Sequence, residues 1–323
     1  MRQDQLSVSL ELVTIGRVSV DLYAREQGVG FAEVETFAKS IGGSPTNVAV
    51  AAARLGRRAA VITAVGDDAF GEYVRGALAD RFGVDVRFVG THPTLRTPLA
   101  FAAMDPPEEP QLLFYREPAA PDMQIELSGI DRAAVRAADI LWVSASALSS
   151  EPSRGTTLAL MGERERSTTI LDLDYRPTFW RDEAEASAVI GGALGLAGTA
   201  VGNREECRVA VGSDDPGSAA DALLARGCRL AVVKQGGDGV LVATPEERTV
   251  VPPHLVKVVC GLGAGDAFGG ALVHGLLEGW EPARVAAYGN AAGAIVASRL
   301  ACADAMPTLE ELTELVDAQG GAR

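Results

Sequence analysis

A glycine-rich segment near the C-terminus, residues 261–266 (Gly-Leu-Gly-Ala-Gly-Asp), has the composition of an anion-binding loop. The apolar run 255–259 before it predicts a strand, and the amphipathic run after it predicts a helix. Glycines at such a junction let backbone N–H groups converge on an anion, and the positive end of the helix adds to the attraction. We therefore expect the backbone of this loop to bind an anion. A purely structural turn is the alternative.

Asp266 extends the chemistry of this segment. A carboxylate at the start of a helix is often only a cap. Beside an anion cradle, however, it is placed to accept a proton from a hydroxyl that attacks a phosphoryl group. The cradle and Asp266 together predict phosphoryl transfer with Asp266 as the base.

Three familiar nucleotide sites do not match the sequence. The dinucleotide-binding fingerprint needs a glycine where Asp266 stands, and helices follow where its second strand should be. The P-loop needs a lysine after glycine, and none of the three lysines (Lys39, Lys234 and Lys257) follows one. The H-R-D and D-F-G motifs of protein kinases are absent from the sequence.

A second glycine pair, Gly42 and Gly43, lies in the N-terminal part of the chain. It precedes a predicted helix, so free N–H groups and the Asn47 amide are placed to bind sugar hydroxyls. Asp21 follows a glycine that ends a predicted strand and is a candidate hydroxyl acceptor. An ordinary tight turn and a plain loop carboxylate are the alternatives.

Regular elements must position these residues, and the apolar pattern indicates which ones. Buried strands are predicted over residues 6–16, 59–65, 139–144, 168–174, 199–202 and 230–235. Helices are predicted over residues 46–55, 70–82, 264–277, 282–300 and 308–316. Strands that alternate with helices indicate an α/β fold with a mostly parallel sheet covered on both faces.

Two stretches, at about 17–41 and 96–117, interrupt this alternation. They contain short alternating runs, including 33–36 and 111–115, separated by Pro and Gly. They predict a small β lid over the mouth of the main sheet. At 323 residues with 47% hydrophobic composition, we expect one domain over residues 1–323.

Charge and cysteine content limit the partners and the compartment. The 29 Lys and Arg residues against 43 Asp and Glu give a net charge of −14, which argues against nucleic acid and anionic membranes as partners. The four cysteines include no C-x-x-C pair, and the N-terminus lacks a signal-peptide pattern. Glycines dilute the uncharged run 186–203, which excludes it as a membrane span. These features predict a cytoplasmic protein with reduced thiols.

Three segments together resemble the signatures of the ribokinase-like (PfkB) carbohydrate kinase family. They are the glycine pair and helix at 42–56, residues 65–71 (Val-Gly-Asp-Asp-Ala-Phe-Gly) and residues 263–268 (Gly-Ala-Gly-Asp-Ala-Phe). The resemblance covers nearly the whole chain and implies a three-layer α/β sandwich with a small β lid. It also implies ATP-dependent phosphorylation of a sugar hydroxyl, with Asp266 as the base and the backbone of residues 263–265 as the anion hole.

The resemblance also implies ligands for ATP and Mg²⁺. An N-x-x-E motif of the family, whose acid acts on Mg²⁺ through bound water, is matched by Asn203 and Glu206. Positions near the nucleotide are matched by Lys234, Gly236, Gly239 and Asn290. Without the resemblance, Glu206 reads as a solvated acid at a helix start, Lys234 as a strand cap and Asn290 as a buried polar group.

Within the family, the sequence is most similar to kinases that phosphorylate 5-dehydro-2-deoxy-D-gluconate in inositol catabolism. The similarity is in residues 15–23, 114–118, 173–177 and 290–307. The carboxylate of a sugar acid matches the fork of a guanidinium group. We therefore expect Arg116, Arg176 or both to bind it, with Lys39 and Tyr115 as weaker candidates. Surface ion pairs are the alternative for both arginines.

Other functions stay open at this point. Within the family the alternatives are 2-keto-3-deoxygluconate kinase, ribokinase and fructokinase. A binding module without activity and a dinucleotide-dependent oxidoreductase are alternatives from other classes. Cys260 and Leu262 replace the Asp and Thr that help many relatives bind a monovalent cation, so the resemblance does not extend to that site. The family also suggests a homodimer through the lid.

Overall fold

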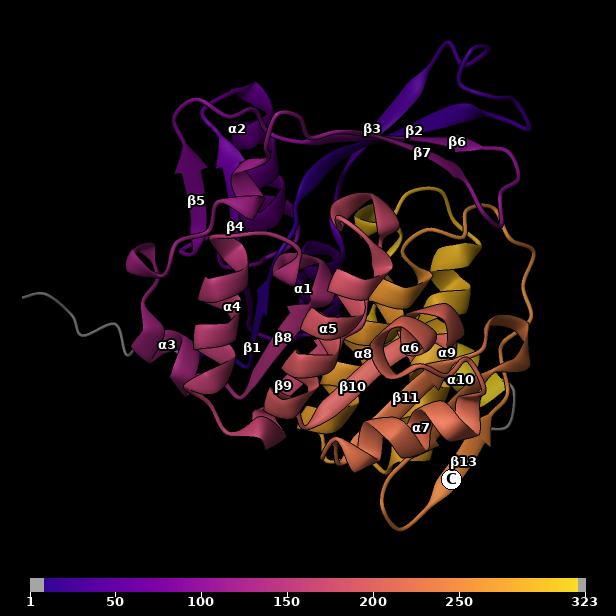
Figure 1. Ribbon diagram of the computed structural model, residues 1–323. Coiled ribbons are helices and arrows are strands. Elements are labelled where there is room, and N and C mark those ends of the chain that lie inside the picture. Colours follow the sequence, from indigo (N-terminus) through magenta and orange to yellow (C-terminus); the bar gives the residue numbers. More distant parts are fainter. Residues whose placement is uncertain (1–8, 319–323) are drawn as a thin grey trace, which may run out of the picture.

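The computed structural model describes residues 9–318 of the chain, and nine strands in it form one large sheet (Figure 1). The strands are β1 (Leu12–Ile15), β4 (Ala59–Gly66), β5 (Val89–His92), β8 (Ile140–Ser144), β9 (Thr169–Asp172), β10 (Thr199–Asn203), β11 (Leu230–Lys234), β12 (Val240–Ala243) and β13 (Arg248–Val251). Their order is β13-β12-β11-β10-β9-β8-β1-β4-β5. All pairs from β11 to β5 are parallel, while β11-β12 and β12-β13 are antiparallel. The predicted mostly parallel sheet is confirmed.

Helices cover both faces of this sheet, which gives three layers (Figure 1). One face carries α3 (Arg132–Ala137), α4 (Ser153–Gly162), α5 (Glu183–Ala193), α6 (Arg204–Val211) and α7 (Pro216–Ala225). The other carries α1 (Ser44–Arg54), α2 (Ala69–Gly76), α8 (Ala264–Leu277), α9 (Pro282–Ala297) and α10 (Leu309–Ala318). The three-layer sandwich implied by the family resemblance is therefore confirmed.

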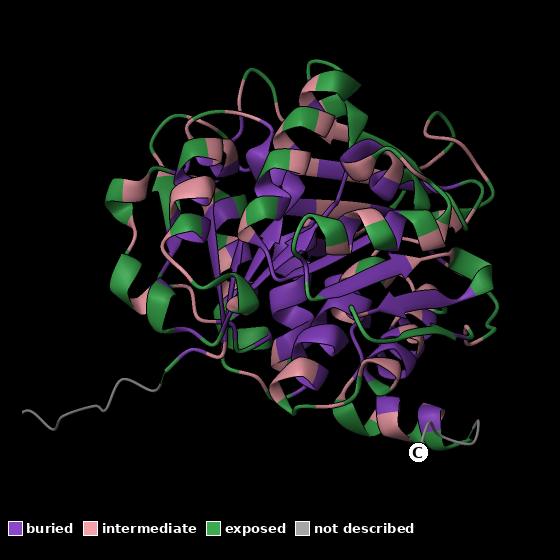
Figure 2. Cartoon of the chain, turned by 60° about the horizontal axis from the view of Figure 1, so that its bottom comes forward, coloured by how far each residue is buried: buried purple, intermediate pink, exposed green. Residues whose placement is uncertain are grey.

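The buried strands separate two hydrophobic cores, one on each face of the sheet (Figure 2). Successive side chains of β1 alternate between them, with Leu12 in the core of α1 and α8 and Val13 in the core of α3 to α7. Because both faces are covered, the central strands, namely β1, β4, β8, β9, β10 and β11, are buried at nearly every position, as expected for parallel sheets. This explains why their sequences are continuous apolar runs.

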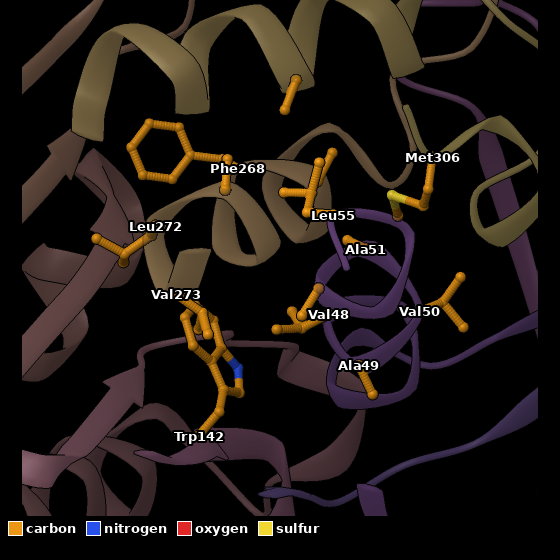
Figure 3. Close-up of a cluster of buried hydrophobic side chains, with 14 of the residues drawn as sticks. Val48, Ala49, Val50, Ala51, Leu55, Trp142, Phe268, Leu272, Val273 and Met306 are labelled. Atoms are coloured by element: carbon orange, nitrogen blue, oxygen red, sulfur yellow. The ribbon is translucent and has the colours of Figure 1, made fainter. Parts of the chain in front are cut away.

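Helices α1 and α8 pack closely against each other (Figure 3). A Cβ at Gly270 of α8 would lie 2.3 Å from Cβ of Ala51 in α1. The core between the helices also holds Val48 of α1 and Trp142 of β8. This close approach brings the N-terminal ends of both helices, each preceded by glycine, to the same part of the molecule.

A second sheet of four strands forms the lid, at the top of Figure 1. Its strands are β2 (Ser19–Gln27), β3 (Phe37–Gly42), β6 (Leu99–Met104) and β7 (Gln111–Tyr115), in the order β3-β2-β6-β7. Both segments predicted for the lid therefore contribute strands to it. The run 33–36, which was expected to be extended within the lid, lies outside these strands.

The strand predicted over residues 255–259 is wrong. Strand β13 ends at Val251, and two prolines follow it, so the chain crosses to α8 without sheet pairing. Leu255 is 84% exposed, so the apolar run there does not reflect burial. The helix predicted over 70–82 also differs, because α2 ends at Gly76 and a π-helical turn, Ala77–Arg81, follows.

Two further expectations can be compared with the described residues. No helix within residues 9–318 is both long and apolar enough to cross a bilayer. The four cysteines (Cys207, Cys228, Cys260 and Cys302) are all buried and unpaired with one another.

Candidate active site

A cavity of about 550 Å³ lies at the carboxyl ends of the central strands, under the lid. The ends of β9, β10 and β11, the starts of α1 and α8, and lid strands β2, β6 and β7 all contribute to its wall. This is the edge where ligands bind in open parallel sheets. Of the residues predicted from the sequence, the cavity is lined by Asp21, Gly43, Asn47, Arg176, Asn203, Glu206, Lys234, Gly236, Gly263, Gly265 and Asp266.

Asp266 and Asn47 meet across the two helix starts. Oδ2 of Asp266 accepts a hydrogen bond of 2.8 Å from Nδ2 of Asn47. Burial raises the pKa of Asp266 to about 6, although the hydrogen bond from Asn47 acts in the opposite direction. A carboxyl group with a pKa near neutrality can both accept and release a proton, as a general base requires.

The predicted anion hole is the open first turn of α8. Gly263 is its N-cap with φ of 81°, and a Cβ there would lie 2.8 Å from Sγ of Cys302. Gly265 is exposed, and a Cβ there would have Nζ of Lys234 as its neighbour at 3.2 Å. The first turn of α8 is therefore open at Gly265, beside a cation, which suits an anion.

The lid touches the same loop. The N–H of Gly261 donates a hydrogen bond of 2.9 Å to the carbonyl of Pro107, between β6 and β7. A Cβ at Gly261 would lie 2.2 Å from the carbonyl oxygen of Glu108, so glycine is required for this approach. The tip of the lid thus closes one side of the cavity.

Asn203 and Glu206 form a reciprocal cap at the start of α6. Oδ1 of Asn203 accepts the Glu206 N–H at 2.9 Å, and Oε2 of Glu206 accepts the Asn203 N–H at 2.7 Å. Glu206 is only 5% exposed and lines the cavity, with Oε1 3.7 Å from Nη1 of Arg176. Glu206 is therefore a buried helix cap that borders the cavity, and not a solvated acid at a helix start.

Lys234, at the end of β11, lies among acidic groups. Burial lowers the pKa of its ammonium, but Glu206, Asp172 and Asp266 raise it, and the pKa ends above its ordinary value. The side chain is therefore a cation within the cavity. Such a group can bind phosphate oxygens next to the first turn of α8.

The glycine pair before α1 is packed tightly. A Cβ at Gly42 would lie 2.0 Å from Oδ2 of Asp21, and a Cβ at Gly43 would lie 2.3 Å from the carbonyl oxygen of Arg17. Asp21 accepts hydrogen bonds of 2.6 Å from Ser19 and 2.9 Å from Tyr23, and burial raises its pKa. Gly42 is thus next to the carboxylate but does not line the cavity itself.

Two acidic residues of the cavity wall, Asp172 and Asp174, were missed by the sequence analysis. Burial raises the pKa of Asp172 to about 8; the charge of Lys234 acts in the opposite direction, and the neighbouring carboxylates act in the same direction as burial. Burial also acts to raise the pKa of Asp174, but Arg176 and Arg17 hold it well below its usual range. Asp172 ends β9, and Asp174 follows it by two residues. Their position at the carboxyl end of a predicted parallel strand could therefore have identified them as site residues.

Besides Gly42, three predicted substrate residues lie outside the cavity wall. Nζ of Lys39 lies 3.8 Å from the ring centre of Tyr73, and Tyr115 is 62% exposed. Arg116 forms an ion pair with the fully buried Asp122 and lies over the ring of Phe179, 5.4 Å from its centre. These contacts leave Arg116 near the site, but with its charge already paired.

The remaining nucleotide positions surround a smaller cavity of about 170 Å³. Its wall includes Lys234, Gly236, Gly239, Ala264, Gly265 and Asn290. Nδ2 of Asn290 donates to the carbonyls of Val251 and Pro252, at 3.2 and 2.8 Å. Lys234, Gly236 and Gly265 border both cavities, so the two are adjacent.

Comparison with known proteins agrees with this geometry. The model of the pfkB family of carbohydrate kinases matches residues 9–309. The chain belongs to the pfkB family of carbohydrate kinases. Membership confirms the resemblance stated above and identifies the protein as an enzyme that phosphorylates carbohydrates, which removes the oxidoreductase alternative.

Relatives of this carbohydrate kinase share nearly its full length. A 5-dehydro-2-deoxygluconokinase from Photobacterium profundum is 37% identical over 317 residues, covering 95% of both chains. A 5-dehydro-2-deoxygluconokinase from Geobacillus thermodenitrificans is 33% identical, covering 97% of this chain and 95% of the relative.

Solved structures of other sugar kinases have the same fold. A fructokinase from Vibrio cholerae O395, in a form with bound fructose, ADP and calcium ion, matches with a TM-score of 0.82 and 28% identity. That match covers 95% of this chain and 99% of the fructokinase. A sugar kinase from Pyrococcus horikoshii, in complex with ATP, matches with a TM-score of 0.79 and 27% identity over 95% of this chain and 99% of that one.

Proposed function

We propose that this carbohydrate kinase transfers the γ-phosphoryl group of ATP to the terminal hydroxyl of 5-dehydro-2-deoxy-D-gluconate. The product would be 6-phospho-5-dehydro-2-deoxy-D-gluconate, a step of inositol catabolism. The supporting observation is the hydrogen-bonded pair of Asp266 and Asn47 beside the open first turn of α8. The kinases of this substrate that match nearly the full chain support the acceptor.

Asp266 and the glycine turn have different roles in the proposed phosphoryl transfer. The ionised carboxylate accepts the proton of the sugar hydroxyl as that oxygen attacks phosphorus, and Asn47 fixes the carboxylate. The N–H groups of residues 263–265 and the ammonium of Lys234 stabilise charge on the transferred group. Lid residues over the cavity keep water from the reacting oxygen.

The residues fit magnesium ATP. The smaller cavity beside Gly239 and Asn290 is proposed for the nucleoside, since it adjoins the anion site at Gly265. Glu206, held by Asn203, is proposed to act on Mg²⁺ through a bound water. Mg²⁺ supplies charge neutralisation for the phosphate oxygens and keeps most of its hydration shell. Cys260 and Leu262 offer no carboxylate or hydroxyl for a monovalent cation, so we propose none.

Cationic and hydroxyl-binding groups are proposed to select the sugar acid. Arg176 lines the cavity and is the more accessible of the two predicted arginines, with 44% of its side chain exposed. Arg116, which follows lid strand β7 and is held by its ion pair with Asp122, is proposed to contribute to binding of the substrate carboxylate. Asp21 and the Gly43 backbone are proposed to bind sugar hydroxyls, since both line the cavity.

We further propose a cytoplasmic homodimer joined through the lid. Leu113 and Tyr115 of β7 are exposed, while Leu112 and Phe114, which alternate with them along the strand, line the cavity. Such a lid face is suited to a second copy of the chain. Light scattering of the wild-type protein and of L113E tests this, and a monomeric wild type would refute it.

The substrate is tested by ADP formation with ATP, Mg²⁺ and one sugar at a time. The panel is 5-dehydro-2-deoxygluconate, 2-keto-3-deoxygluconate, ribose and fructose. We expect turnover with the first sugar and a product phosphorylated at its terminal carbon by ³¹P NMR. Preference for another sugar would overturn the acceptor, and ADP formation with none of them would favour a binding module.

A further inference from the structure

One arginine of the cavity wall, Arg17, takes no part in the proposed phosphoryl transfer. Arg17 follows β1, is 6% exposed and lines the cavity. Its Nε donates a hydrogen bond of 2.9 Å to Oγ of Ser146, and its Nη2 donates one of 3.0 Å to Oδ2 of Asp174. Within residues 9–318 no acceptor bonds Nη1. Because a buried arginine is normally fully paired, the free N–H groups of Nη1 point to a ligand.

An aromatic ring fixes the orientation of this guanidinium. The Arg17 guanidinium carbon lies 4.5 Å from the ring centre of Phe179, and that of Arg116 lies 5.4 Å from the same centre. Phe179 is itself in edge contact with Phe114 of the lid, with 5.5 Å between ring centres. Stacking and the two hydrogen bonds hold Arg17 rigidly, so little entropy is lost when it binds an anion.

Arg17 has to share its ion-pair partner. Asp174 lies 3.0 Å from Nη2 of Arg17 and 3.3 Å from Nη2 of Arg176. Arg176 has a second carboxylate, that of Glu206, at 3.7 Å, whereas Asp174 is the only acid paired with Arg17 among the described residues. An anion at Nη1 would therefore give Arg17 a partner of its own.

Arg17 and Arg176 bind different oxygens of Asp174 and differ in their other neighbours. Nη1 of Arg176 lies 3.7 Å from Glu206, on the side proposed for phosphate and metal. Arg17 instead borders the sugar side, since its carbonyl lies at the glycine turn before α1, where a Cβ at Gly43 would be 2.3 Å from it. A carboxylate on Arg17 would thus lie away from the reacting phosphate.

We propose that Arg17 binds the carboxylate of the sugar acid through Nη1 and thereby selects acids over neutral sugars. The proposal rests on the proposed function, because it assumes that a sugar acid enters this cavity. Binding at this end leaves the far, terminal hydroxyl of the substrate for Asp266. Arg17 is then a specificity-determining residue that acts together with the predicted arginines.

The test compares wild type, R17Q and R17K on two acceptors. One is 5-dehydro-2-deoxygluconate, and the other is its neutral analogue with an alcohol in place of the carboxylate. For R17Q we expect kcat/KM for the acid to fall about 100-fold, with the neutral analogue changed less than threefold. R17K keeps the charge but loses the fork, so a loss of about tenfold is expected. Calorimetric titration with the acid, without ATP, should show the same weakening.

Controls separate binding from folding. R17Q leaves Asp174 with one partner fewer, so R17Q/D174N, which removes both charges, must show the same loss of acid preference. Arg164 is a partly buried arginine outside the cavity wall that donates to the backbone carbonyls of Val135 and Ala138. R164Q should therefore leave the preference for the acid over the neutral analogue unchanged.

Each outcome decides the assignment. An acid-to-alcohol preference in R17Q within threefold of wild type would overturn the role of Arg17. Wild type that binds the acid without phosphorylating it would refute the proposed function, while the titration with R17Q would still decide Arg17. Wild type that does neither would refute both.

Discussion

The two glycine-led helix starts at the cavity, before α1 and before α8, look alike in sequence but differ in packing. At α1, a Cβ on Gly43 would lie 2.3 Å from the Arg17 carbonyl, so the glycine allows two backbone segments to touch. At α8, a Cβ on the N-cap Gly263 would also be close to a neighbour, 2.8 Å from Sγ of Cys302. Gly265, in the first turn of α8, is exposed, and its Cβ would have one neighbour, the Lys234 ammonium at 3.2 Å. Both N-caps therefore hold the architecture, and the first turn of α8 in addition leaves its N–H groups for an anion.

The largest expected effect is on the chemistry at α8. D266N keeps a hydrogen-bond acceptor for Asn47 but cannot accept the hydroxyl proton. We expect kcat to fall about 1,000-fold with both KM values changed little. Steady-state ADP formation measures this, and thermal unfolding checks that the variant is folded. A loss below tenfold would show that Asp266 is not the base.

The next effect should be on folding at α1. G43A must adopt φ of 97° and place a Cβ against the Arg17 carbonyl. We expect the free energy of unfolding to fall by about 2 kcal/mol or more. Urea unfolding followed by fluorescence measures it. A variant as stable as wild type would contradict the role of Gly43 in holding the architecture.

G265A changes a glycine in the first turn of α8, and its effect on stability should be smaller. Alanine is favoured over glycine inside a helix, so stability should change by less than about 1 kcal/mol. The new methyl group enters the space beside Lys234, so kcat/KM for ATP should fall about tenfold. Steady-state kinetics with ATP varied measures this. If stability fell instead and kinetics did not, both junctions would be structural.

The smallest effect is a shift in pH dependence. Because the base must be ionised and burial raises its pKa to about 6, kcat/KM for the sugar should rise with pH and level off above that value. Asn47 lowers this pKa by hydrogen bonding, so N47A should move the rise to higher pH. A pH profile of both proteins tests it. A profile for N47A moved to lower pH would contradict this coupling.

Much of the scaffold could be predicted because it depends on local signals. The glycine-rich segment and apolar periodicity placed the helix over 264–277, the bounds that α8 has. The strand expected over 255–259 was wrong because apolar residues there are exposed, and burial cannot be read from residue type alone.

The cavity wall was harder to predict because its contacts are distant in sequence. Arg17 and Asp174 are 157 positions apart, so neither residue's environment is visible from its neighbours. Lys39 and Tyr115 were chosen by residue type and lie outside the cavity wall. Which of several arginines faces the cavity depends on tertiary packing, here on Phe179 and Asp122.

The hydrogen bond from Gly261 to the lid carbonyl of Pro107 couples the position of the lid to the loop before α8. Because that N–H belongs to the loop that leads into the anion hole, movement of the lid must disturb the loop as well. The order of events then matters: a sugar that draws the lid down also sets the loop for ATP. Idle hydrolysis of ATP should accordingly be slow whenever the acceptor is missing.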